Sequence, residues 1–128
     1  MKKILNYSQQ SINKDDIIQV CKVLKSNYLT TGPKVKEFEN KICSFTQSNH
    51  CTVVNSATSG LHISCLALGL KKNDQVWTSP ISFVASANCA VYCGAKIDFV
   101  DIDDETFNIS LEKLRKKLEF SKKNNTLP

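Results

Sequence analysis

The sequence lacks an apolar run long enough to span a membrane, and no apolar stretch of a secretory signal peptide follows its lysine-containing start. It also has no CxxC pair, no repeat of fixed period and no low-complexity segment. These absences argue against a membrane protein, a secreted disulfide scaffold and a repeat array, so we expect a cytoplasmic, reduced chain. What remains is a 128-residue sequence, 41% hydrophobic and 23% charged, which suits one globular domain or a part of one.

The six cysteines are scattered, which argues against a disulfide framework. Most fall on apolar faces of predicted elements, where a free thiol packs as a small hydrophobic side chain. Cys89 and Cys93 are four residues apart and could share a metal ion with His50 or His62, but the sequence offers no second ligand pair. We therefore expect free thiols and no metal site.

The net charge of +5 comes from 17 basic and 12 acidic residues. Much of the excess lies between residues 113 and 123, in the last predicted helix and at its end. Basic residues at a helix C-terminus complement the helix dipole, and a solvated helix face accounts for the run. We expect neither a nucleic acid nor a membrane as partner.

Helical spacing marks the first third of the chain. Asn13 can cap a helix over residues 14–26. After a break at residues 27–32, Pro33 stands in the first turn of a second helix that should end near Gln47. The side chains predicted to share the apolar face of the first helix or to point inward from the second are Ile17, Val20, Cys21, Leu24, Val35, Phe38, Ile42 and Phe45.

Strands and helices then alternate with short connections. The predicted strands are residues 51–54, 75–78 and 96–100, and the predicted helices are one from near Leu61 to Gly69, one over residues 84–93 closed by Gly94, and one capped by Ser110 with Leu111, Leu114 and Leu118 inward. This alternation predicts an α/β architecture, a mainly parallel sheet flanked by helices. Because three strands are fewer than such sheets usually have, we expect an incomplete sheet, the N-terminal part of a larger fold.

The segment Asn55-Ser56-Ala57-Thr58-Ser59-Gly60 connects a predicted strand to a predicted helix. Unpaired N–H groups and the positive end of the helix dipole bind anions at such a place. Ser56, Thr58 and Ser59 add hydroxyl donors, and the small side chains let a phosphate approach the backbone. The segment predicts a phosphate site, with an ordinary capped helix as the alternative.

Phe83 follows the next predicted strand, in the turn Ser79-Pro80-Ile81-Ser82-Phe83. Ligands of open α/β sheets collect beyond the carboxyl ends of the strands. Phe83 could therefore stack on a flat ring whose phosphate is held at Thr58 and Ser59. Plain core packing is the alternative for this side chain.

A calcium-like spacing of carboxylates occurs at Asp101, Asp103, Glu105 and Glu112. The place where a calcium loop needs glycine is Thr106, and a predicted strand precedes the loop instead of a helix. We interpret this segment as an acidic surface connection to the last helix.

Five motifs in order carry a resemblance to a known family between residues 7 and 110. The motifs are Leu29-Thr30-Thr31-Gly32-Pro33 with Phe38-Glu39, Asn55-Ser56-Ala57-Thr58-Ser59-Gly60-Leu61-His62, Ala67-Leu68-Gly69-Leu70, residues 79–88 and Gly94-Ala95-Lys96 with Phe99-Val100-Asp101-Ile102. With these motifs the chain resembles the DegT/StrS sugar-nucleotide aminotransferases, and Tyr7-Ser8 and Ser-Pro-Ile-Ser-Phe-Val-Ala are most like members acting in pseudaminic acid biosynthesis.

The resemblance implies the N-terminal part of a fold type I (aspartate aminotransferase-like) large domain, which binds pyridoxal 5′-phosphate (PLP). It further implies a homodimer, glutamate as amino donor and a UDP-4-keto-6-deoxy-N-acetylhexosamine as acceptor. Residues 1–33 would form an N-terminal helix and substrate-contacting arm, and residues 34–128 an incomplete PLP-binding domain. The implied cofactor-binding residues are Thr58, Ser59 and Phe83, and the implied substrate-binding residues are Tyr7, Asn27, Tyr28, Leu29, Thr30 and Ser56.

The family's Schiff-base lysine matches no lysine of this chain, because it lies downstream in the proteins that the chain resembles. Without that base no group can move the proton that transamination requires. We therefore expect a truncated N-terminal portion that is inactive by itself. The alternative is a non-catalytic module that binds a phosphorylated ligand or a nucleotide-sugar.

Overall fold

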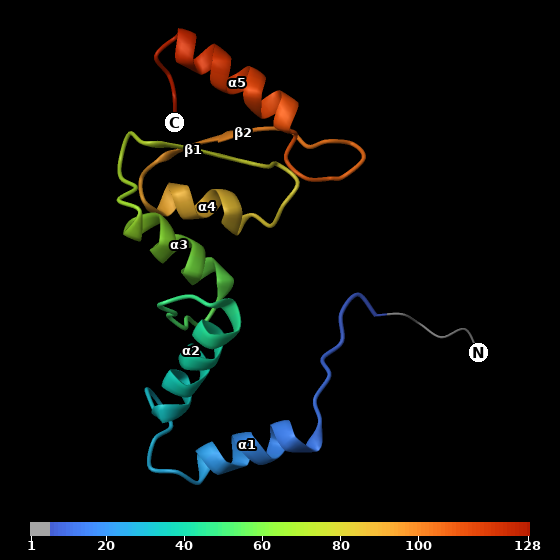
Figure 1. The fold of residues 1–128 in the computed structure, drawn as a ribbon, viewed down its shortest axis with the longest axis vertical. Helices are drawn as coiled ribbons and strands as arrows, with labels where there is room; N and C mark the ends of the chain where they lie inside the picture. Colours follow the sequence, from blue (N-terminus) through green and yellow to red (C-terminus); the bar gives the residue numbers. More distant parts are fainter. Residues whose placement is uncertain (1–5) are drawn as a thin grey trace, which may run out of the picture. The chain divides into compact units, whose positions relative to one another are not determined.

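The structure is a computed structural model that describes residues 6–128. Its contacts divide the chain into two compact units, with the boundary in the sequence between Val53 and Val54. Each unit is built from short elements, drawn in sequence colours in Figure 1. The sequence predicted a different division, after residue 33, between a substrate-contacting arm and a PLP-binding domain. That division is defined by which ligand each part binds, so it stays a prediction.

The first unit holds helices α1 (Lys14–Leu24) and α2 (Pro33–Thr46). Asn13 caps α1 as predicted: its side chain accepts hydrogen bonds from the N–H groups of Asp15 and Asp16, and the Asp16 carboxylate accepts one from the Asn13 N–H at 2.9 Å. This reciprocal capping box satisfies donors that the helix itself leaves free.

Helix α2 begins at Pro33 and ends at Thr46, one residue before the predicted end. Gln47 adopts a left-handed conformation with φ of 57°, and its N–H bonds the carbonyl of Cys43. A left-handed residue after the last turn ends a helix by satisfying its free carbonyls. The predicted break between the two helices and the predicted start of α2 are both confirmed.

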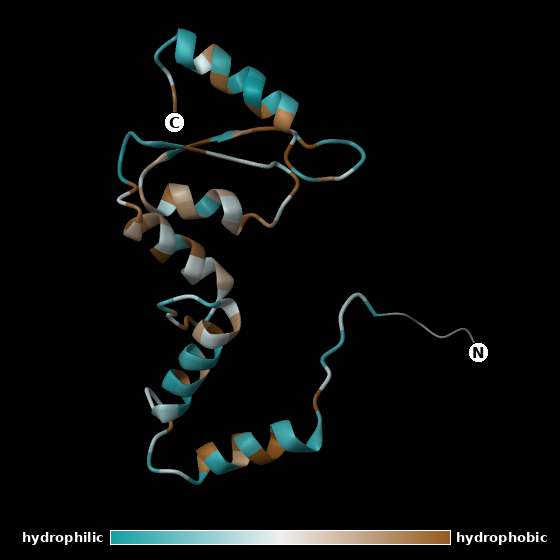
Figure 2. Ribbon diagram, in the orientation of Figure 1, coloured by the Kyte–Doolittle hydropathy of each residue, from teal (hydrophilic) through white to brown (hydrophobic). Residues whose placement is uncertain are grey.

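The apolar faces of these two helices are exposed, which the spacing did not predict. Phe45 is 88% exposed, and more than 40% of the surface of Ile17, Val20, Leu24, Val35 and Phe38 is also accessible. Figure 2 shows the corresponding apolar bands along α1. Within the described chain no other element packs against α1 or α2. The spacing identified the apolar faces correctly, whereas the predicted inward position of Val35, Phe38 and Phe45 is wrong.

The predicted strand at residues 51–54 is wrong. These residues have no ladder partner in the part of the chain that the structure describes, and the Val53 N–H instead donates to the Glu39 carboxylate at 3.2 Å. A strand exists only where a neighbour accepts its hydrogen bonds, and an apolar run cannot supply that neighbour.

The second unit is a small α/β layer, as predicted, although it has two strands instead of three. The strands are parallel and in register from Gln75 opposite Lys96 to Thr78 opposite Phe99. The elements are α3 (Ala57–Ala67), β1 (Gln75–Thr78), α4 (Ala85–Tyr92), β2 (Lys96–Phe99) and α5 (Leu111–Lys123). The predicted strands at 75–78 and 96–100 are present, and so are the predicted helices over residues 84–93 and after Ser110. The helix predicted from near Leu61 to Gly69 begins four residues earlier, at Ala57, and ends at Ala67.

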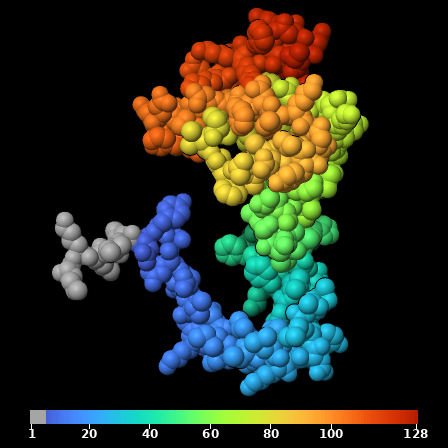
Figure 3. All heavy atoms as spheres, turned by 180° about the vertical axis from the view of Figure 1, so that it is seen from behind, coloured from blue at the N-terminus to red at the C-terminus, as the bar shows by residue number. Residues whose placement is uncertain are grey.

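Helix α4 joins the two strands and packs against both, and α3 packs on α4. The rings of His62 in α3 and Tyr92 in α4 meet edge to face at 5.3 Å. Figure 1 draws the two strands between α4 and α5, and Figure 3 shows the same elements closely packed from behind. Gly94 closes α4 with a φ of +75°, a conformation that a residue with a Cβ rarely adopts.

The buried hydrophobic residues are small and cluster around α4. They are Ala85, Cys89, Ala90, Ala95 and Val100. Larger apolar side chains stay accessible even here, and Leu111, predicted to face inward, is 77% exposed. The close approach of α4 to the strands therefore depends on small residues instead of on interlocking large ones.

Helix α5 is attached to the sheet through Lys117. Its ammonium group pairs with the Asp98 carboxylate at 2.5 Å, donates to the Phe99 carbonyl at 2.6 Å and lies 4.9 Å from the centre of the Trp77 ring. These contacts hold the pKa of Asp98 below its usual value, chiefly through the hydrogen bond from Lys117. The basic run on α5 thus includes one residue that joins the helix to both strands.

Candidate functional site

The predicted phosphate segment forms the start of α3. Ser56 is the N-cap, in an extended conformation, and its hydroxyl oxygen accepts a hydrogen bond from the Ser59 N–H at 3.1 Å. Small residues fill the first turn, so the backbone there is open to a ligand. The predicted cap and the predicted site are therefore the same few residues, which is the usual arrangement at anion-binding helix ends.

The hydroxyl groups of Ser56 and Ser59 form a hydrogen-bonded chain that ends at the Asn55 side chain. Ser59 donates its hydroxyl hydrogen to the Asn55 side-chain oxygen at 2.9 Å. The Ser59 oxygen lies 3.0 Å from that of Ser56, and because its only hydrogen is already used, Ser56 must be the donor. The Ser59 side chain is thus held by its neighbours on both sides.

Thr58 keeps its donors free. Neither its hydroxyl nor its backbone N–H has an acceptor among residues 6–128, and the same holds for the Ala57 N–H. These three donors belong to consecutive residues in the first turn of α3. Of the two residues expected to hold a phosphate, Thr58 can donate at once, whereas Ser59 must first give up its bond to Asn55.

Phe83 lies in the turn between β1 and α4, and the residue is 74% exposed. Its backbone is fixed, because its carbonyl accepts a hydrogen bond from the Ser86 N–H at 3.0 Å and Ser82 and Ser86 share a hydroxyl hydrogen bond at 3.0 Å. An accessible ring on a fixed turn excludes plain core packing within the described chain. It offers a flat apolar surface to a ligand.

The two predicted parts of the cofactor site begin on the same side of the second unit. In Figure 1, α3 and α4 both start on the side toward which β1 and β2 end. Thr58 and Ser59 lie in the first turn of α3, and Phe83 immediately precedes Val84, the N-cap of α4. The strand ends are where ligands of α/β sheets bind.

The residues predicted to contact a substrate fall in both units. Ser56 caps α3 in the second unit. Tyr7 is fully exposed in the first, and Asn27, Tyr28, Leu29 and Thr30 form the turn between α1 and α2. The structure therefore brings the four turn residues together, with the Tyr28 and Leu29 side chains largely accessible.

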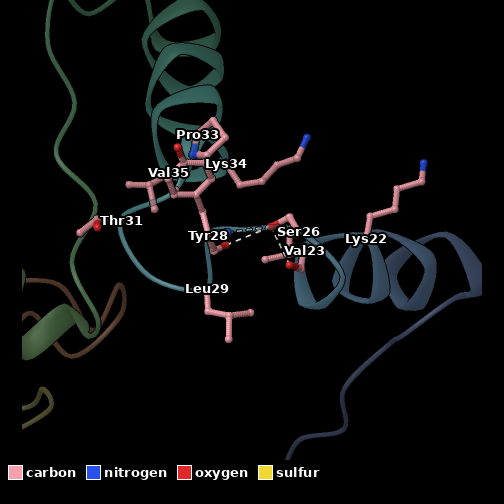
Figure 4. A pocket seen from close by; sticks show the side chains of 10 residues that line it. Lys22, Val23, Ser26, Tyr28, Leu29, Thr31, Pro33, Lys34 and Val35 are labelled. Carbon is pink, nitrogen blue, oxygen red and sulfur yellow. Dashed lines mark hydrogen bonds between the residues drawn. The ribbon is translucent and has the colours of Figure 1, made fainter.

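A hollow of about 200 Å³ lies at that turn, and the sequence did not reveal it. Tyr28 and Leu29 line it together with side chains from the end of α1 and the start of α2, drawn in Figure 4. Lys22 and Lys34, neither of which was predicted, also line it. Residues from two separate helices meet here only because of the turn geometry, which spacing does not encode.

The acidic connection after β2 uses its carboxylates internally. Asp103 accepts hydrogen bonds from the backbone and hydroxyl of Thr106 at 2.9 Å, which hold the pKa of its carboxyl below the usual value. Lys113 hydrogen-bonds Asp101 and likewise lowers its pKa. No group of histidine, cysteine or carboxylate side chains within residues 6–128 is arranged to hold a metal ion.

The cysteines are free, as expected, and three of them neighbour one another between α3 and α4. Burial, together with hydrogen bonding to Cys89 and proximity to Cys93, raises the pKa of the Cys65 thiol to about 11. A thiol with so high a pKa stays protonated near neutral pH and is a poor nucleophile. These residues serve packing.

In the described part of the chain, no helix has the combined length and apolarity that crossing a bilayer requires.

Comparison with known proteins places this geometry in context. Residues 10–124 match the model of the DegT/DnrJ/EryC1/StrS aminotransferase family. A UDP-4-amino-4,6-dideoxy-N-acetyl-beta-L-altrosamine transaminase of Campylobacter jejuni is 44% identical over 115 residues, which cover 90% of this chain and 30% of that protein. The spore coat polysaccharide biosynthesis protein SpsC of Bacillus subtilis is 40% identical over 86% of this chain and 28% of its own length.

Solved structures agree with the sequence relatives. Helicobacter pylori PseC, an aminotransferase of pseudaminic acid biosynthesis, has a TM-score of 0.82 and 34% identity, covering 89% of this chain and 31% of its own. A Streptococcus pneumoniae protein described as a sugar aminotransferase and solved in its PLP form has a TM-score of 0.83 and 30% identity, covering 88% and 29%.

The chain thus spans about 30% of the length of the curated relatives that it matches. The matched region includes α3 with its free donors, the Phe83 turn and the strands between them. The resemblance noted from the motifs, and the partial fold type I architecture that it implied, are confirmed. The chain belongs to the DegT/DnrJ/EryC1/StrS aminotransferase family, whose structural neighbours bind PLP.

Proposed function

We propose that this chain supplies the PLP-phosphate-binding helix and the nucleotide-sugar-binding turn of a transaminase. The substrate would be a UDP-4-keto-6-deoxy-N-acetylhexosamine, with glutamate as amino donor, and the working form a cytoplasmic homodimer. The observation that carries the proposal is the set of free donors on Ala57 and Thr58 on the side where β1 ends and Phe83 follows. The C. jejuni transaminase, 44% identical, supports the substrate class.

The donor set fits the cofactor. A phosphate dianion needs several N–H and O–H donors with small side chains around them, and the first turn of α3 offers three that are unused. A pyridine ring needs a flat apolar partner, which the exposed Phe83 ring provides. PLP, when bound, supplies an electron-withdrawing ring on which an amino group can be transferred.

Each residue then has a defined task. Thr58 binds the phosphate directly through its hydroxyl and backbone. Ser59, held by Asn55 and Ser56, shapes the first turn and donates to the phosphate only after it releases Asn55. Phe83 limits tilting of the ring and excludes water from one of its faces. Ser56, Tyr7 and the turn residues Asn27–Thr30 contact the nucleotide-sugar.

We expect the 128-residue chain alone to bind ligands without transferring the amino group. None of its lysines matches the family's Schiff-base lysine, so no side chain here is placed to move the substrate proton. By itself the chain would then bind ligands without catalysis, like the non-catalytic binding module that the sequence analysis kept as an alternative.

The direct test is to titrate the purified chain with PLP, following its absorbance, and with a UDP-sugar by calorimetry. Saturable PLP binding supports the proposal, and failure to bind PLP contradicts it. UDP-sugar binding without PLP binding favours the module that lacks a cofactor. Glutamate-dependent amination of the keto sugar would contradict the expected inactivity of the chain alone.

A further inference from the structure

Three of the six cysteines form a cluster where α3 packs on α4 (Figure 1). Cys65 belongs to α3, Cys89 lies within α4 and Cys93 is the C-cap of α4. The thiols of Cys89 and Cys93 both lie close enough to Cys65 to influence its ionisation. This thiol cluster consists of residues to which neither the cofactor nor the substrate has been assigned.

The packing of the two helices turns the thiols toward one another. His62 and Cys65 share one face of α3, because side chains three or four positions apart lie together on a helix. By the same spacing Tyr92 and Cys93 share a face of α4 with Cys89. The rings of His62 and Tyr92 meet edge to face at 5.3 Å. The face of α3 that carries Cys65 therefore lies against the face of α4 that carries the other two thiols.

Two of the three thiols suit a bond between the helices. Cys89 is only 5% exposed and its thiol donates to the Ser86 carbonyl at 3.4 Å, so a solute has little access to it. Cys65 and Cys93 are partly exposed. Cys93 also stands where the chain leaves α4 at Gly94, so its backbone can adjust to the narrow geometry of a disulfide more easily than a residue inside the helix.

We propose that Cys65 and Cys93 form a reversible disulfide between α3 and α4 when the chain meets a peroxide. The Cys93 sulfur first takes one oxygen atom from the peroxide, which gives a sulfenic acid and, with hydrogen peroxide, one water. The Cys65 sulfur then attacks the Cys93 sulfur: the S–S bond forms, the S–O bond breaks, and the hydroxyl leaves with the Cys65 proton as a second water. Together the two thiols lose the two electrons that the peroxide gains.

Two opposing effects govern the second step. The pKa of Cys65, about 11, leaves only about one thiol in ten thousand ionised at pH 7, which slows attack by this sulfur. Against this, groups held side by side can reach effective concentrations of about 10⁵ M, and a thiolate of high pKa is the stronger nucleophile. Proximity outweighs the small ionised fraction, so Cys65 closes the disulfide although it reacts poorly with free oxidants.

The disulfide would lie away from the residues assigned to the cofactor. Thr58 is in the first turn of α3 and Phe83 comes before α4, whereas Cys65 is in the last turn of α3 and Cys93 at the end of α4. We therefore expect the oxidised chain to keep its PLP affinity. Closing the segment between the two cysteines restricts the unfolded chain, so the oxidised form should unfold at a higher urea concentration.

The test is to treat the purified chain with hydrogen peroxide, alkylate the remaining thiols and locate disulfides by tandem mass spectrometry of tryptic peptides. We expect a link between Cys65 and Cys93 within one chain, which dithiothreitol removes. Cys65→Ser and Cys93→Ser should each abolish it. Cys89→Ala, beside both thiols, and Cys43→Ala, in α2, are matched controls that should retain it. Circular dichroism of each variant confirms that its helices are intact.

Other outcomes would overturn the inference. A link through Cys89, a link between two chains, or sulfinic acid at Cys93 without a link would show that Cys65 and Cys93 do not meet. The same follows if the link survives either serine substitution, or if the fully oxidised chain has an unchanged urea midpoint. The link is detected by mass, so the result does not depend on the proposed function. If oxidation abolishes PLP binding in a chain that binds PLP when reduced, the disulfide does not lie away from the cofactor.

Discussion

The two units of the chain differ in how they use apolar residues. The second unit buries small ones, such as Ala90, where α4 crosses the sheet, and adds the polar attachment of Lys117. The first unit carries strong helical patterns and good caps, yet large side chains such as Phe45 stay accessible. Local sequence signals are therefore sufficient to form a helix, whereas burial requires a second surface.

The sharpest test of this difference is a pair of substitutions. Ala90→Leu in the fully buried position of α4 should destabilise the chain by about 1–3 kcal/mol, because a larger side chain overpacks the contact with the strands. Phe45→Ala in α2 should change stability by less than about 0.5 kcal/mol, because the ring is already exposed. Urea unfolding followed by circular dichroism measures both, and an equal loss in the two variants would remove the contrast.

Because no other element of the described chain packs against α1, its stability should depend on the Asn13 cap. Asn13→Ala removes the hydrogen bonds that start α1 and should cost about 1 kcal/mol of local helix stability. Asn13→Asp keeps an acceptor at the same place and is the matched control. Circular dichroism at 222 nm measures the helical content, which should be lower in Asn13→Ala than in Asn13→Asp. Identical spectra of the two variants would mean that α1 does not depend on its cap.

A smaller effect is expected on the stability of the fold at acidic pH, through the pair of Asp98 and Lys117. The pKa of Asp98 is lower in the folded state than its usual value, so its pairing with Lys117 stabilises the fold above that usual value, about 4. The contribution is lost as the pH falls through the lowered folded-state pKa, when the carboxylate takes up a proton. Because the pair is partly exposed, we expect a modest change. Asp98→Asn should flatten the acid limb of the pH–stability curve, and an unchanged limb would contradict this assignment.

How far the sequence predicts the structure depends on the range of the interaction involved. The Asn13 and Ser110 caps and the Gly94 stop follow from signals within a few residues, and all are present. The parallel pairing of β1 with β2 follows from the alternation of strands and helices and is also present. The strand at 51–54 and the burial of Phe45 required partners elsewhere, and for these the predictions were wrong. Spacing and propensity carry no information about such partners.

The candidate site shows the same limit on a smaller scale. The motif indicated the start of α3 and the turn before α4 as places for a phosphate and a ring. It could not distinguish Thr58, whose donors are free, from Ser59, whose hydroxyl already bonds Asn55. That distinction depends on which way each hydroxyl points. Lys22 and Lys34 were not predicted, because these two lining residues of one hollow stand twelve positions apart in the sequence.

The central claim is that Thr58 holds the cofactor phosphate, and the PLP dissociation constant of the Thr58→Ala variant tests it most directly. Absorbance titration should show PLP binding weakened by about tenfold, because a free hydroxyl donor to a dianion is lost, while Thr52→Ala, outside the helix, leaves binding unchanged. Phe83→Ala should weaken PLP binding and spare the binding of inorganic phosphate. Wild-type PLP affinity in both Thr58→Ala and Phe83→Ala would contradict the account.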